Sequence, residues 1–167
     1  MRLFFALWPP AATAQALAGW AREVQKDAGG RVTETGSIHL TLAFLGEAEP
    51  MKASAAAERV SANKFELKIQ EAKYWKHNRI VWVGPQAMPA QLERLVGQLH
   101  PALEGAGFVL EERPFAAHVT LIRKAGLPSS IPPLPQVHWP ADEFVLVSST
   151  PSGIGSRYET VQRYPLT

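Results

Sequence analysis

The sequence predicts an α+β fold of two pseudo-symmetric lobes, each an antiparallel sheet with helices on the outside, and a groove between the lobes. Two observations lead to this prediction. The pattern His-x-Thr-hydrophobic occurs twice, at 39–42 and at 118–121, and the separation of the copies is close to half of the 167 residues. Each copy follows an amphipathic helical stretch and a glycine stop, so the chain reads as a diverged internal repeat with one histidine strand in each lobe.

Local patterns assign the individual elements. Period-two alternation and apolar, β-branched runs predict strands at 2–8, 38–44, 65–74, 80–83, 108–110, 117–122, 144–147 and 157–164. Helical spacing of apolar residues predicts helices at 11–28 and 51–63 and from Pro89 onward, where Pro101 is expected to kink or restart the helix. Residues 76–79 and 151–156 read as turns, and the proline-rich stretch 127–135 reads as a loop.

Composition narrows the class of protein. Hydrophobic residues make up 46% and charged residues 19% of the chain, which is typical of a globular protein, and the net charge of +2 permits a phosphate ligand. The chain has no cysteine, which excludes disulfides and cysteine-based zinc sites. No apolar run approaches 18 residues. We expect one bilobal domain over 1–167, a cytoplasmic location, no membrane association and a monomer.

The repeated pattern places an imidazole beside a hydroxyl. Side chains two apart on a strand share a face, so His39 and Thr41 point one way, and His118 and Thr120 do the same in the second copy. Two histidines on opposite sides of a phosphorus atom can divide an in-line displacement, one as base and one as acid. The threonine hydroxyls can bind the phosphoryl oxygens. No set of carboxylates is spaced to hold a metal, so we expect no cofactor.

These motifs resemble the two-histidine (2H) phosphoesterase superfamily, and within it the RNA 2′,3′-cyclic phosphodiesterases, also called 2′-5′ RNA ligases. The resemblance spans essentially the whole chain, with supporting stretches at 2–7, 39–46, 113–115 and 148–158. It implies metal-independent hydrolysis of RNA or nucleoside 2′,3′-cyclic phosphate to a 2′-phosphate, with RNA ends or nucleotides as partners. Reversible 2′-5′ ligation is a related activity of the family.

The resemblance also implies roles for single residues. His39 matches the proton donor to the departing 3′ oxygen, and His118 matches the acceptor that activates water. Thr41 and Thr120 match the phosphate-binding threonines. Arg123, five residues after the second histidine, matches a basic phosphate-binding residue, although simple alternation places it on the opposite face unless the strand ends or bulges there.

The remaining expectations concern the walls of the groove. Phe44, five residues after the first histidine, matches a residue that could stack on a nucleobase or simply belong to the core. Arg157 and Tyr158 are expected at the edge of the groove. The roles of the two histidines could be exchanged. The alternatives for the whole protein are a non-catalytic nucleotide- or RNA-binding module, and a 2H phosphodiesterase for another cyclic phosphate or oligonucleotide end.

Overall fold

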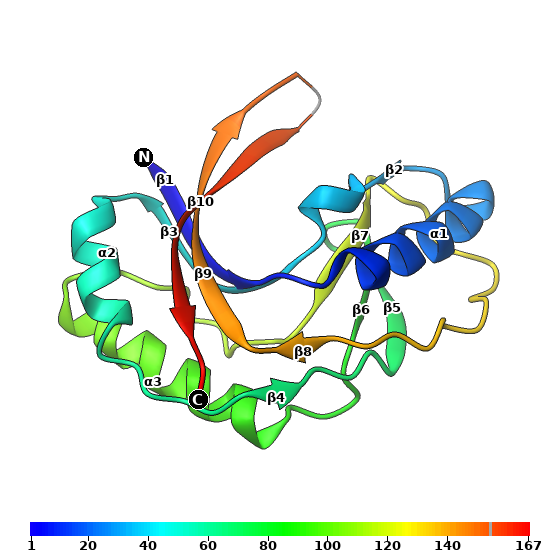
Figure 1. Cartoon of the computed structure of the whole chain (residues 1–167). Helices are drawn as coiled ribbons and strands as arrows, with labels where there is room; N and C mark the ends of the chain where they lie inside the picture. The colour runs from blue at the N-terminus through cyan, green and yellow to red at the C-terminus, as the bar shows by residue number, and fades with distance from the viewer. Residues whose placement is uncertain (154) are drawn as a thin grey trace.

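Two four-stranded antiparallel sheets dominate the computed structural model, which describes residues 1–153 and 155–167 (Figure 1). The strands are β1 Arg2–Leu7, β2 Arg31–Val32, β3 Leu40–Glu47, β4 Phe65–Glu66, β5 Glu71–Trp75, β6 Ile80–Gly84, β7 Val119–Arg123, β8 Pro140–Ala141, β9 Glu143–Pro151 and β10 Ser156–Pro165. The helices are α1 Ala11–Ala28, α2 Pro50–Ala57 and α3 Ala90–Gly105, with a 3₁₀ turn η1 at Thr35–Ser37.

Each sheet contains one of the two histidine strands. The first sheet has the order β10-β9-β1-β3, and the second has the order β2-β7-β6-β5. A two-stranded sheet, β4-β8, lies apart from both. The strand pairs within the sheets are antiparallel. The predicted α+β fold with one histidine strand per lobe is therefore confirmed.

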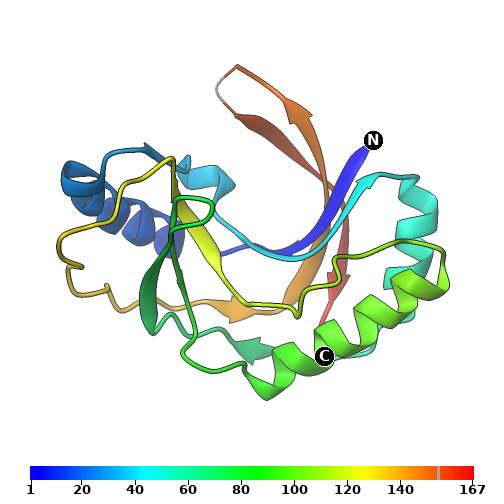
Figure 2. The same cartoon turned by 180° about the vertical axis from the view of Figure 1, so that it is seen from behind.

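A lobe is not the same as half of the sequence. The helix of the first half, α1, packs on β2 and β7 of the second sheet. The helix of the second half, α3, packs beside α2 on the side of the first sheet, and Figures 1 and 2 show these helices at opposite outer sides of the molecule. Each helix thus covers the lobe that holds the other half's histidine strand. None of the helices among the described residues is long and apolar enough to cross a bilayer.

One hydrophobic core runs through both lobes. It joins the inner face of β1 to residues of all three helices and to the inner faces of β3 and β7. Helical spacing explains the burial of Leu92, Leu95, Leu99 and Leu103 on α3. A second, smaller cluster covers the other face of the first sheet and consists of Phe4, Ala6, Val145 and Val147, with Trp8 and Tyr158 packed against it. That other face carries the site.

Three local predictions are wrong because tertiary contacts override the local pattern. The strand predicted at 65–74 is divided into β4 and β5, since the Leu67 amide bonds to Trp139 while the Gln70 amide bonds to Gly84 of the second sheet. The segment 108–110 pairs with no strand of the described residues, and Val109 is 92% exposed. The second helix ends at Ala57 rather than at residue 63.

Helix α3 continues through Pro101 instead of restarting there. A proline inside a helix costs about 3 kcal/mol because it removes a hydrogen bond. The buried leucines on both sides of Pro101 keep the helix on the core, and burying a leucine is worth about 1.5–3 kcal/mol. The turn predicted at 76–79 is confirmed, whereas Ile154 in the turn predicted at 151–156 lies outside the described residues.

Gly30 is a point of close approach between the end of α1 and the end of β7. Its φ is +83°, and a Cβ at this position would lie 2.5 Å from the Arg123 carbonyl oxygen. The neighbouring Gly29 also has a positive φ, +68°, but nothing lies within 4 Å of a Cβ there. Alanine at position 29 would therefore cause backbone strain alone, whereas alanine at position 30 would cause backbone strain and a steric clash.

We predict that Gly30→Ala destabilises the protein much more than Gly29→Ala. Backbone strain should cost about 1–3 kcal/mol at either position, because both glycines have a positive φ. The clash with β7 should add about 1–3 kcal/mol at position 30 only. The free energy of unfolding in urea measures both variants, and equal losses would show that the chain relaxes away from Arg123.

Candidate active site

The two histidines lie just before their strands and are held in the same way. The Nδ1 of His39 is 2.7 Å from the Ser37 carbonyl oxygen, and the Nδ1 of His118 is 2.8 Å from that of Ala116. A carbonyl only accepts, so each Nδ1 carries a hydrogen and donates it. In the neutral ring this leaves Nε2 as the proton acceptor. The equivalent nitrogen is therefore available for chemistry in both motifs.

His39 sits in an aromatic box on the groove face of the first sheet. Trp8 stacks parallel to its ring at 4.7 Å between centroids, and Phe4 and Tyr158 lie at 5.0 and 5.5 Å. Its Nε2 is 3.0 Å from the Thr41 Oγ1, as expected for side chains two apart on one face. The hydroxyl donates to Nε2 when the ring is neutral.

His118 has aromatic neighbours from the second sheet. The Trp75 ring meets it at 4.7 Å and the Trp82 ring at 6.1 Å, both close to edge-on. Trp82 is also the strand partner of Thr120. These two tryptophans therefore form the wall beside the second histidine.

A β-bulge follows the threonine in both motifs. Phe5 and Ala6 pair with Ala43 and Thr41, so Leu42 is skipped in the pairing of β1 with β3. The pairing of β6 with β7 skips Leu121 at the corresponding place. An extra residue reverses the alternation of faces beyond it. The residue five after each histidine consequently returns to the face of the histidine.

The bulges decide the positions of Arg123 and Phe44. Arg123 is the last residue of β7, its side chain is exposed, and it lines the groove. The strand thus both bulges and ends before Arg123 would be turned toward the core, as its predicted place in the site requires. Phe44 is 58% exposed, with its ring 5.8 Å from that of Phe4, and so does not belong to the core. Simple period-two counting would have placed both side chains on the core side.

The pKa values of both histidines are lowered, and the causes show which charged groups lie near them. Burial lowers the pKa of His39 from its ordinary 6.5 to about 4, opposed by the Ser37 carbonyl and reinforced by the charges of Arg123 and His118. Burial also lowers the pKa of His118, opposed by the Ala116 carbonyl and reinforced by Arg123. Both histidines therefore lie within electrostatic reach of Arg123, and a bound anion would offset these effects.

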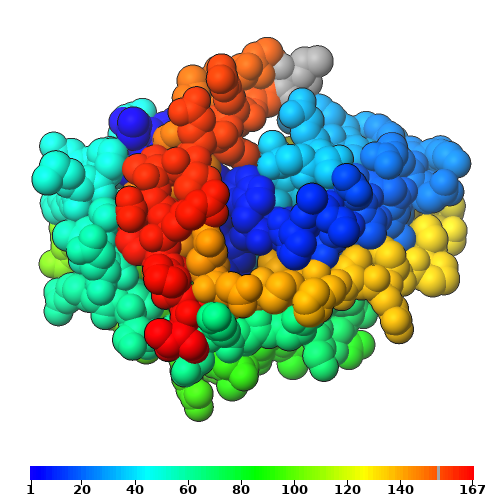
Figure 3. All heavy atoms as spheres, in the orientation of Figure 1, coloured from blue at the N-terminus to red at the C-terminus, as the bar shows by residue number. Residues whose placement is uncertain are grey.

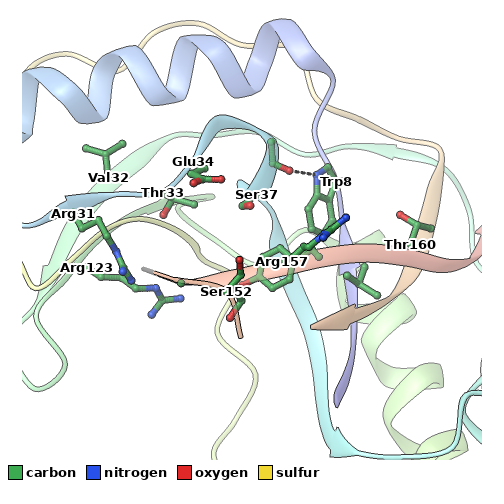
Figure 4. A pocket seen from close by; sticks show the side chains of 15 residues that line it. Trp8, Arg31, Val32, Thr33, Glu34, Ser37, Arg123, Ser152, Arg157 and Thr160 are labelled. Carbon is green, nitrogen blue, oxygen red and sulfur yellow. Dashed lines mark hydrogen bonds between the residues drawn. The ribbon is translucent and has the colours of Figure 1, made fainter. Parts of the chain in front are cut away.

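A groove of about 950 Å³ lies beside His39. Figure 3 shows a hollow beneath the β9–β10 hairpin, and Figure 4 shows Arg31 and Arg123 at one end and Trp8 and Arg157 at the other. The histidines and threonines are not among the described residues that line it. Trp8 and Tyr158 join the two regions, because they line the groove and touch the His39 ring.

The sequence predicted some of the residues that line the groove but not others. Arg157 and Tyr158 line the groove as expected. Trp8 and Arg31 were missed; the signal for Trp8 was its place two residues beyond Ala6 on the same strand face. Arg31 faces Arg123 as its partner on β2, a pairing that only the sheet order reveals.

Metal-ligating side chains do not gather at this site. Within residues 1–153 and 155–167, no group of three or more histidine, aspartate or glutamate side chains is arranged to hold a metal ion. Glu34 lines the groove beside the arginines. The positive charges at the groove thus come from arginine, which suits an anionic ligand.

The duplicated histidine strands, together with an arginine-lined groove beside His39, are the features of a phosphoesterase of the two-histidine class. The family model described as "LigT like Phosphoesterase" matches residues 7–82 and again residues 83–158. The chain belongs to this family. The two matches also confirm the internal repeat inferred from the motifs.

Relatives and solved structures support this assignment over nearly the whole length. The RNA 2′,3′-cyclic phosphodiesterase of Escherichia coli K12 is 36% identical over 171 residues, which cover 99% of this chain and 97% of that protein. A crystal structure of E. coli LigT complexed with 3′-AMP has a TM-score of 0.92 at 33% identity, with 99% and 98% coverage. A crystal structure of a Thermus thermophilus protein has a TM-score of 0.82 at 26% identity, with 99% and 98% coverage.

We predict that acid destabilises the protein in part through His39. Its folded-state pKa of about 4 is below the unfolded value of 6.5, so the unfolded chain binds the additional proton between these pH values. Stability should be complete above about pH 6.5 and should fall as the pH approaches 4, by on the order of 2 kcal/mol from this group. Urea unfolding at pH 7 and pH 4.5 measures the loss.

The matched variant for this prediction is His39→Asn. Its amide can still donate to the Ser37 carbonyl but does not titrate. Carboxylates and His118 are common to both proteins, so the smaller acid-induced loss in the variant isolates His39. An identical pH dependence in the two proteins would contradict the buried, neutral state of His39.

Proposed function

We propose that the protein hydrolyses RNA or nucleoside 2′,3′-cyclic phosphates to 2′-phosphates by acid–base catalysis, without a metal. The observation that supports it most is the equivalent fixation of two imidazoles by carbonyls, with both rings within reach of Arg123. The relatives' names point to the same reaction class. RNA ends and nucleotides that carry the cyclic phosphate are the substrates we propose.

In the proposed reaction water attacks phosphorus in line with the 3′ oxygen. His118 Nε2 takes a proton from the attacking water, and the new P–O bond forms as the P–O3′ bond breaks. His39 Nε2 gives its proton to the departing 3′ oxygen. The products are the 2′-phosphate and a free 3′ hydroxyl, and a proton returns from His118 to His39 through solvent. With a 5′ hydroxyl in place of water as the attacking group, the same chemistry gives a 2′-5′ linkage.

The substrate supplies the protonation state that this reaction needs. In the free protein the lowered pKa values keep both histidines neutral near pH 7. A cyclic phosphate carries a negative charge, and a nearby anion favours a protonated imidazole. Once Nε2 of His39 carries a proton, it no longer accepts from the Thr41 hydroxyl, which is then free to donate to a phosphoryl oxygen.

Thr41, Thr120 and Arg123 complete the proposed phosphate site. The threonines supply neutral donors on the same faces as the histidines, and Arg123 supplies a fixed positive charge. Phe44 is the proposed base-stacking residue, because its exposed ring shares the face of Thr41 beyond the bulge. Donors from both lobes would thereby stabilise the negative charge that develops on the phosphoryl oxygens.

We predict that His39→Asn and His118→Asn each lower kcat at least about 100-fold, because each removes one proton-transfer group. The assay is product analysis with 2′,3′-cyclic AMP in EDTA, in which the wild type should form 2′-AMP. The control His138→Asn alters a histidine whose partner is Glu66, outside the site, and should retain full activity.

Several outcomes would contradict this proposal. Full activity in either variant would exclude the His/His mechanism, and loss of activity in EDTA would exclude metal independence. Tight nucleotide binding without turnover would favour the binding-module alternative. A cyclic analogue with sulfur at the 3′ position assigns the roles, because a thiolate leaves without a proton and should rescue only the variant that lacks the acid.

We predict that Phe44→Ala raises KM for 2′,3′-cyclic AMP about tenfold or more, since stacking on an aromatic ring is worth about 1–3 kcal/mol per base. The free energy of unfolding should change little because the ring is exposed. KM for a base-free substrate, glycerol 1,2-cyclic phosphate, should be unchanged. Met51→Ala, at an 86% exposed apolar position, is the control variant, and equal KM values for Phe44→Ala and wild type would exclude stacking.

A further inference from the structure

The bulge of the first motif depends on a partner outside its own sheet. Leu42, the skipped residue, is only 1% exposed, so its carbonyl oxygen needs a donor from the protein. In the second motif the sheet supplies the donor: the Thr33 amide, just after β2, bonds to the Leu121 carbonyl at 2.8 Å. Among the described strands, β3 is at the edge of its sheet and has no such neighbour.

A histidine of α3 takes this place in the first motif. His100 Nε2 is 2.8 Å from the Leu42 carbonyl oxygen, and because a carbonyl only accepts, the imidazole donates. Its half-buried ring also meets Phe115 edge-on at 6.0 Å between centroids, three residues before His118. One side chain thus contacts the bulge of the first motif and the segment that leads into the second.

We propose that His100 is a positioning residue for the reaction: its bond to the Leu42 carbonyl holds the bulge that keeps Phe44 on the face of His39 and Thr41. Without the donor, the carbonyl would be buried and unpaired, and the bulge would shift or flatten to find another partner. A change of one residue in pairing moves a side chain to the other face of a strand. Thr41 lies directly before the bulge and Phe44 two residues after it.

The inference rests on the proposed function, and its test keeps the two apart. His100→Leu removes the donor and keeps an apolar side chain beside Phe115, whereas His100→Gln keeps a donor at about the reach of Nε2. The matched control is Gln98→Met on the same helix, which removes side-chain bonds to the Ser61 backbone at 2.8 Å, away from the motifs.

With 2′,3′-cyclic AMP, His100→Leu should lower kcat/KM about tenfold, the effect of losing a buried hydrogen bond of roughly 1.4 kcal/mol. Part of this loss should be a KM increase that glycerol 1,2-cyclic phosphate does not show, because only a nucleoside substrate uses Phe44. His100→Gln should restore most of the loss, and Gln98→Met should retain the wild-type constants even where it lowers stability.

Hydrogen exchange gives a readout that does not require activity. The amides of Ala43 and Phe44 should exchange faster in His100→Leu than in the wild type, and not faster in Gln98→Met. If the wild type proves inactive on cyclic phosphates, the proposed function fails while this measurement still tests the bulge. Unchanged exchange in His100→Leu, equal kinetic losses in Gln98→Met, or no restoration by His100→Gln would overturn the role of His100.

Discussion

The site depends on the packing of two strands against one shared core. Leu40 and Leu42 of β3 and Val119 and Leu121 of β7 are at most 1% exposed and belong to the same hydrophobic cluster. Because successive side chains of a strand point to opposite faces, burial of these leucines and of Val119 turns the histidine and threonine of each motif away from the core. The two histidine strands also approach each other between the lobes, and the charge of His118 contributes to the lowered pKa of His39.

Electrostatics then suits this arrangement to an anion. The aromatic rings around His39 and His118 exclude water, which disfavours the imidazolium form of both histidines, and the charge of Arg123 acts in the same direction. The phosphate that we propose as ligand would offset both influences, because a nearby negative charge favours the protonated imidazole. The burial that lowers the two pKa values also makes these histidines costly to protonate in acid.

The two motifs are linked because a helix from each half of the sequence packs against the sheet that contains the motif of the other half. Helix α1 comes from the first half and covers β7, while α3 comes from the second half and contacts β3 through His100. Neither lobe can form from one sequence half, so the relative placement of the histidines is built into the fold. These crossing segments approach the strands closely at two points, Gly30 beside Arg123 and His100 beside Leu42.

Local periodicity and spacing were enough to predict the repeat, the histidine strands, the lengths of α1 and of the β5–β6 turn, and the residue types of the site. The division of 65–74 between two sheets, the continuity of α3 through Pro101, and the return of Phe44 and Arg123 to the groove face depend instead on contacts between distant segments. The local sequence does not predict a bulge, because a bulge is defined by which residue of a strand is left unpaired by the neighbouring strand. That pairing exists only after distant segments of the chain have come together.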